Sequence, residues 1–114
     1  MNEFLLLMQG DDSKEISPDE MQTRLQNYMG WMKMMTEKGV LKAGQPLEPT
    51  GVLLENKETV ITDGPFLEPK EIIGGYIIVT AETIEEATEF AKSCPLLDHC
   101  RIMVRPLVNI PGGE

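Results

Sequence analysis

The residues with the clearest chemical potential lie in the middle of the chain. Asp63, Glu68 and Lys70 bring two carboxylates and one amine close together in the sequence. Gly64 tolerates positive φ and Pro65 has a fixed φ, so this pair favours a turn that holds Asp63 in one direction. A carboxylate held in this way acts as a general acid or base when a cleft partly removes it from water.

We therefore predict Asp63 as a catalytic residue and Glu68, Lys70 and Tyr76 as ligand-binding residues. Each of them also has a purely structural interpretation. An aspartate at such a turn commonly accepts hydrogen bonds from the backbone of the turn, and Asp63 can do the same. Glu68 and Lys70 can form an ordinary exposed ion pair, and Tyr76 can simply pack in a strand.

Cys94, His99 and Cys100 form a second group of reactive residue types. They supply at most three metal ligands, and their spacing matches no common zinc pattern, so no metal site is predicted. We interpret the two cysteines as small buried hydrophobes and His99 as a turn residue. The sequence also lacks the motifs of dinucleotide sites, P-loops, serine hydrolases and HExxH zinc proteases, so no cofactor is predicted.

Composition limits the classes of partner. A chain of 114 residues forms one domain, which we expect to span residues 1–108, followed by a flexible tail at 109–114. Acidic residues outnumber basic ones 19 to 10, which disfavours nucleic acid and favours a basic protein partner. The apolar runs are shorter than the roughly 20 residues of a membrane span, and no export signal is visible, so we expect a cytoplasmic protein.

Hydrophobic periodicity and turn residues divide the chain into six strands and two helices. The expected helices begin at the caps Ser17 and Thr83 and end at Gly39 and Pro95. Gly74 and Gly75 indicate a bulge or a close backbone approach near the start of the fifth strand. The expected strands cover residues 3–9, 40–43, 51–55, 58–62, 72–80 and 101–105.

The first helix carries an apolar stripe at intervals of three and four residues, which predicts a buried face. Trp31 lies at the edge of this stripe and Met34 lies off it, so we assign both to a subunit contact or a pocket wall. The stripe consists of Met21, Leu25, Tyr28, Met32 and Met35.

The order of elements predicts the fold. Strand, helix, strand, hairpin, strand, helix, strand is an α+β arrangement of the ferredoxin-like βαββαβ type with an inserted β-hairpin. Both helices should cover one face of an antiparallel sheet. The other face would be bare and apolar, which is unusual for a monomer, so we expect a homodimer that stacks two sheets.

The central segment resembles a known family. The residues Asp63-Gly64-Pro65-Phe66, Glu68, Lys70-Glu71 and Gly74-Gly75-Tyr76 are similar to the signature of the DGPF-domain branch of the YCII-related proteins. This resemblance implies a dimeric α/β barrel in which two sheets enclose a cleft. The wider group is associated with a His-Asp pair at the active site, but no His occurs here in the first strand or first helix, so that pair does not carry over.

Two functional hypotheses follow. The first is a small enzyme whose dimer cleft uses Asp63 as acid or base on a small polar or aromatic molecule. The second is a noncatalytic module that binds a metabolite or a basic protein. The resemblance implies for the second a link to transcription through an alternative sigma factor.

Overall fold

The computed structural model describes residues 2–10, 17–48, 50–65 and 73–110. Of the predicted site residues, Glu68 and Lys70 lie outside this part of the chain. Neither α-helix of the described part has the length and apolarity to cross a lipid bilayer. The helices are α1 (Pro18–Glu37), α2 (Ile84–Lys92) and the short 3-10 helix η3 (Pro95–Asp98). The strands are β1 (Asn2–Gln9), β2 (Leu41–Pro46), β3 (Thr50–Leu54), β4 (Val60–Pro65), β5 (Ile73–Ala81) and β6 (Arg101–Pro106).

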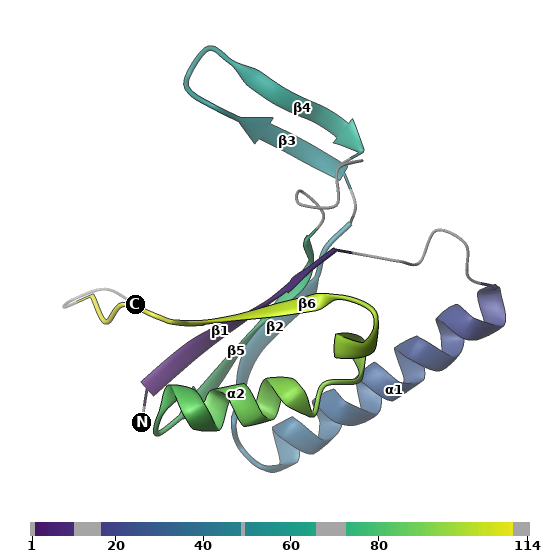
Figure 1. Ribbon diagram of the computed structural model, residues 1–114, viewed down its shortest axis with the longest axis vertical. Coiled ribbons are helices and arrows are strands. Elements are labelled where there is room, and N and C mark those ends of the chain that lie inside the picture. The colour runs from purple at the N-terminus through teal and green to yellow at the C-terminus, as the bar shows by residue number, and fades with distance from the viewer. Residues whose placement is uncertain (1, 11–16, 49, 66–72, 111–114) are drawn as a thin grey trace.

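The strands form two antiparallel sheets, one of four strands in the order β2-β5-β1-β6 and one of two strands, β3-β4. The helices α1 and α2 lie on the same side of the four-stranded sheet (Figure 1). The predicted α+β class and the ferredoxin-like order with an inserted hairpin are therefore confirmed. The short helix η3 was not predicted.

The helices begin and end where their capping residues predict. The backbone N–H of Glu20 donates to Ser17 Oγ at 3.1 Å, and the N–H of Glu86 donates to Thr83 Oγ1 at 3.2 Å. These bonds satisfy amides that have no partner in the first turn of a helix. After α1, Gly39 has φ +76°, the left-handed conformation that commonly ends a helix.

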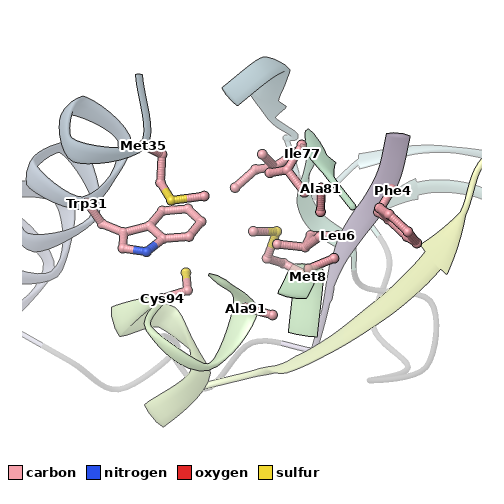
Figure 2. Packing of buried hydrophobic residues seen from close by; sticks show 11 residues of the cluster. Phe4, Leu6, Met8, Trp31, Met35, Ile77, Ala81, Ala91 and Cys94 are labelled. Carbon is pink, nitrogen blue, oxygen red and sulfur yellow. The ribbon is translucent and has the colours of Figure 1, made fainter. Parts of the chain in front are cut away.

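The core lies between the helices and one face of the sheet. Alternate residues of β1 and β5, such as Leu6, Ile77 and Val79, are fully buried there. Figure 2 shows Trp31 and Met35 of α1 pointing toward this face, beside residues of α2. The assignment of Trp31 to a contact surface or pocket wall was therefore wrong: its side chain is 6% exposed.

The position of Trp31 has a local cause. Its indole Nε1–H donates to Ser93 Oγ at the end of α2, at 2.8 Å. This bond satisfies the one polar atom of the ring, so the ring can be buried between the two helices at little cost. Met34 is also partly buried against the core.

No helix of the described residues covers the other face of the four-stranded sheet. Leu7 pairs with Tyr76 and Leu5 pairs with Ile78 across β1 and β5, so these four side chains share this face. All four are half-buried within the single chain. We call this surface the open face; it has the apolar character that motivates the predicted homodimer.

The β3-β4 hairpin stands away from the body, on the side of the sheet opposite the helices (Figure 1). We call this hairpin, residues 50–65, the arm. Asp63 lies on β4 directly opposite Val52 of β3, and its side chain is exposed. The predicted turn at Gly64 and Pro65 was wrong, because both residues continue β4 and pair with β3, although Gly64 does have a positive φ of +121°.

Candidate functional site

A cavity of about 290 Å³ lies at the end of the four-stranded sheet where β1 ends and β5 begins. The first half of α1 forms one wall with Met21, Leu25 and Tyr28. Met21 and Leu25 are 46% and 58% exposed, because this part of the helix does not pack against the core. The predicted stripe of α1 thus has two roles: its first half lines the cavity, and its second half enters the core.

Two polar groups of α1 face this cavity. Arg24 donates from Nε to Glu20 Oε2 at 3.0 Å, one helical turn earlier, which holds its guanidinium at the wall. Burial, with a smaller contribution from Cys94, raises the pKa of Tyr28 above its ordinary value. The phenol therefore remains a neutral hydrogen-bond donor at physiological pH.

The opposite wall includes the glycine pair Gly74 and Gly75. Gly75 approaches β2 so closely that a Cβ at this position would lie 2.9 Å from the carbonyl oxygen of Gln45. Gly74 is the extra residue of a bulge, since Met8 pairs with Gly75 while Gln9 pairs with Ile73. The predicted bulge and close backbone approach are both confirmed. Nothing lies within 4 Å of a Cβ position at Gly74, so this glycine leaves open space at the wall, whereas the space beside Gly75 is taken by β2.

His99 and Cys100 close the cavity from the turn after η3. The backbone N–H groups of both residues donate to the carbonyl of Leu96, at 2.9 and 3.0 Å. These bonds fix the turn and hold the imidazole at the cavity wall. His99 is a turn residue, as predicted, but the turn gives it access to a cavity that the sequence did not reveal.

Cys94 lies in the core and not in the cavity. Its side chain is 3% exposed, and burial raises its pKa to about 11. A thiol that keeps its proton is a poor nucleophile and a poor metal ligand. Within the described ranges, no three His, Cys, Asp or Glu side chains gather as a metal site would require.

The two predicted site residues within the described part of the chain lie on different elements. Asp63 is exposed on the arm and Tyr76 lies on the open face, and neither lines the cavity. Their catalytic and binding roles stay predictions. Sequence reasoning missed Arg24 and Tyr28 as cavity residues, although their spacing of four places them on one side of the helix.

Comparisons with known proteins place the chain in a family. The model of the YCII-related domain matches residues 2–110. An uncharacterized protein of Rhizobium meliloti (strain 1021) is 34% identical over 59 residues, which are 50% of this chain and 48% of that protein. The match therefore spans about half the length of this curated relative.

A solved structure has the same fold. It is the 5-chloro-2-hydroxyhydroquinone dehydrochlorinase of Burkholderia phenoliruptrix in complex with 2,5-dihydroxybenzoquinone. The similarity has a TM-score of 0.55 at 17% sequence identity and covers 97% of this chain and 99% of that one. At this identity the likeness supports the fold class but does not identify the reaction of this chain.

Proposed function

The chain belongs to the YCII-related family, and we propose that it is a small enzyme that acts on a small aromatic molecule with oxygen substituents. The observation that carries the proposal is the cavity of about 290 Å³ with its apolar wall and three polar side chains. An apolar cavity of about 150 Å³ binds benzene, so this one has room for a substituted ring. Apolar walls with a few fixed polar groups are typical of small-molecule sites.

The polar groups suggest how such a ligand would bind and react. Arg24 and Tyr28 supply donors for phenolate, quinone or carboxylate oxygens. His99 is the one imidazole of the chain and the side-chain type that most often transfers protons in enzymes. We assign binding to Arg24 and Tyr28 and proton transfer to His99. The hydroxyquinone ligand of the structural neighbour belongs to the same ligand class.

The homodimer is a separate part of this proposal. A second copy on the open face would cover Leu5, Leu7, Tyr76 and Ile78, which are only half-buried in one chain. Such a copy is also what Asp63 needs in order to enter a cleft. We propose Asp63 and Tyr76 as residues of this dimer cleft, in a protein of the cytoplasm.

Calorimetric titration with 2,5-dihydroxybenzoquinone tests the cavity. We expect the wild type to bind it and Arg24→Gln to weaken binding about tenfold or more, the size of effect typical for the loss of one charged hydrogen bond. Lys33→Gln, which removes an exposed cation of the same helix outside the cavity, is the matched control at the same concentrations. Equal affinity in Arg24→Gln and the wild type would contradict the assignment of the cavity.

Chloride release from 5-chloro-2-hydroxyhydroquinone tests catalysis: His99 would accept a hydroxyl proton while chloride leaves, and hydroxybenzoquinone would form. His99→Gln should keep the affinity for the quinone within about threefold and lose about a hundredfold or more in turnover, since general acid-base catalysis contributes this much. A wild type that binds the quinone but releases no chloride would instead support the noncatalytic module. A loss of turnover in Asp63→Asn alone would move the proton transfer from His99 to Asp63.

A further inference from the structure

We propose that the arm packs its apolar face against a second copy of this chain. The inference rests on the proposed homodimer and not on the chemistry of the cavity. The arm consists of β3, β4 and the turn between them, and Figure 1 shows it standing clear of the helices and the four-stranded sheet. Its apolar side chains are therefore exposed in the single chain and available for contact with another molecule.

Three of the five exposed apolar side chains of the arm share one face. Val52 pairs with Asp63 and Leu54 pairs with Val60, and directly opposed residues of an antiparallel pair project to the same side. Val52, Leu54 and Val60 are 57%, 60% and 52% exposed. Leu53 projects to the other side and is the natural reference residue.

The arm has little to stabilise it in isolation. A two-stranded hairpin is at most marginally stable in water, because it buries too little apolar surface. The side-chain oxygen of Asn56 accepts from the N–H groups of Glu58 and Thr59, at 2.8 and 2.9 Å, which shapes the turn. These exposed bonds define the conformation of the tip but do not bury the apolar face.

Within the described residues, one unpaired acid on the arm and one unpaired base on the open face fit a second copy as the partner. The arm face ends in Asp63, while β6 carries Arg105 opposite Leu5 on the open face. Neither Asp63 nor Arg105 has an ion-pair partner within the described part of the chain. In a twofold dimer each such pair would form twice, with Asp63 of one copy beside Arg105 of the partner subunit.

Sedimentation equilibrium tests the apolar contact. The double variant Val52→Thr/Leu54→Thr keeps the strand propensity of the arm and removes its apolar face. We expect it to raise the dissociation constant of the dimer about tenfold or more. Leu53→Thr makes the matched change on the other side of β3 and should leave the constant within about twofold.

A charge exchange tests the ion pair. Asp63→Lys and Arg105→Glu should each weaken the dimer, and their combination should recover most of the lost affinity, because the pair is restored with reversed sign. Glu37→Lys, at the exposed end of α1, makes the same change in net charge as Asp63→Lys and serves as its control. Equal weakening by Glu37→Lys would assign the effect to net charge and overturn the pair.

Hydrogen exchange of the arm amides separates this inference from the homodimer itself. We expect slower exchange at concentrations above the dissociation constant than below it. One outcome is that the chain dimerises while the arm exchanges equally fast at both concentrations and the arm variants leave the dissociation constant unchanged. This result would overturn the arm contact but not the proposed homodimer. A chain that is monomeric throughout overturns both and assigns the arm to a different protein.

Discussion

The two sheets of this molecule contain similar residues in very different surroundings. In β5, Ile77, Val79 and Ala81 are completely buried, whereas in the arm Leu54 and Val60 are more than half exposed. Both segments have the apolar and β-branched residues that favour strands. The comparison teaches that local composition produces a strand, while burial depends on which other elements cover it.

Packing of the helices on only one of the two sheets has an energetic consequence. The sheet of β2, β5, β1 and β6 has α1 and α2 over one face, so its apolar side chains leave water when the chain folds. No such layer covers the arm within residues 2–10, 17–48, 50–65 and 73–110. We therefore expect the four-stranded sheet to determine the stability of the monomer and the arm to determine its association.

Truncation of one buried side chain should give the largest effect. Ile77→Ala removes atoms from a fully buried position and should lower the free energy of unfolding by about 3–4 kcal/mol. Val60→Ala on the arm, measured below the dissociation constant of the dimer, should cost about 0.5 kcal/mol or less. Urea denaturation gives both values, and similar losses of unfolding free energy would contradict the difference between the two sheets.

Added volume at a glycine should give the next largest effect. A methyl group at Gly75 would lie 2.9 Å from the carbonyl oxygen of Gln45 and 3.2 Å from Cα of Pro46, both of which are backbone atoms. We expect Gly75→Ala to cost about 1–3 kcal/mol in thermal or urea unfolding. Gly74→Ala is the matched control, since nothing lies within 4 Å of its Cβ position, and an equal loss there would contradict the close approach.

The free energy of unfolding should depend on pH because of one buried thiol. The Cys94 thiol keeps its proton up to a pKa of about 11 in the folded chain, against an ordinary value of 9.0. Between these values the folded state binds more protons than the unfolded state, so the free energy of unfolding falls as the pH rises. Below pH 9.0 both states hold the proton and this contribution is constant.

We expect the fall between the two pKa values to be about 1–2 kcal/mol. Urea denaturation across this range in the wild type and in Cys94→Ala measures it, because the variant loses the titrating group and should show a shallower slope. Cys100→Ala is the reference, since this half-buried thiol should leave most of the slope in place. Parallel slopes in all three proteins would assign the dependence to other groups.

The smallest effect should come from the tip of the arm. Asn56→Ala removes two hydrogen bonds of the turn and should accelerate amide exchange in β3 and β4, with a change of about 0.5 kcal/mol or less in global unfolding. Thr83→Ala removes a similar side-chain bond at the start of α2 and should cost about 1 kcal/mol. Equal global losses would mean that the arm and body unfold together.

Local signals made much of the fold predictable. Ser17 and Thr83 cap helices through bonds to residues three positions away, and Gly39 ends α1 through its own backbone conformation. The order of elements then restricted the topology to the ferredoxin-like type. The pair Gly74-Gly75 predicted a bulge or a close backbone approach near the start of β5, because glycine within a strand commonly marks one of the two.

The cavity was not predictable in the same way. Arg24, Gly75 and His99 are far apart in the sequence and meet only after the sheet and α1 have packed. Periodicity showed that one side of α1 is apolar but not where the helix crosses the sheet, so the buried position of Trp31 was missed. The role proposed for Asp63 depends on a second copy, and the sequence of one chain does not show where this residue would lie in a dimer.

The burial of Trp31 between the two helices has a practical consequence. This indole is the one tryptophan of the chain, and its ring lies in the buried cluster that also contains the Cys94 thiol. Its fluorescence will therefore report the docking of α1 on α2, while fraying of the remote hairpin will pass without a spectral change. Tryptophan fluorescence thus follows the unfolding of the helical layer separately from the opening of the arm.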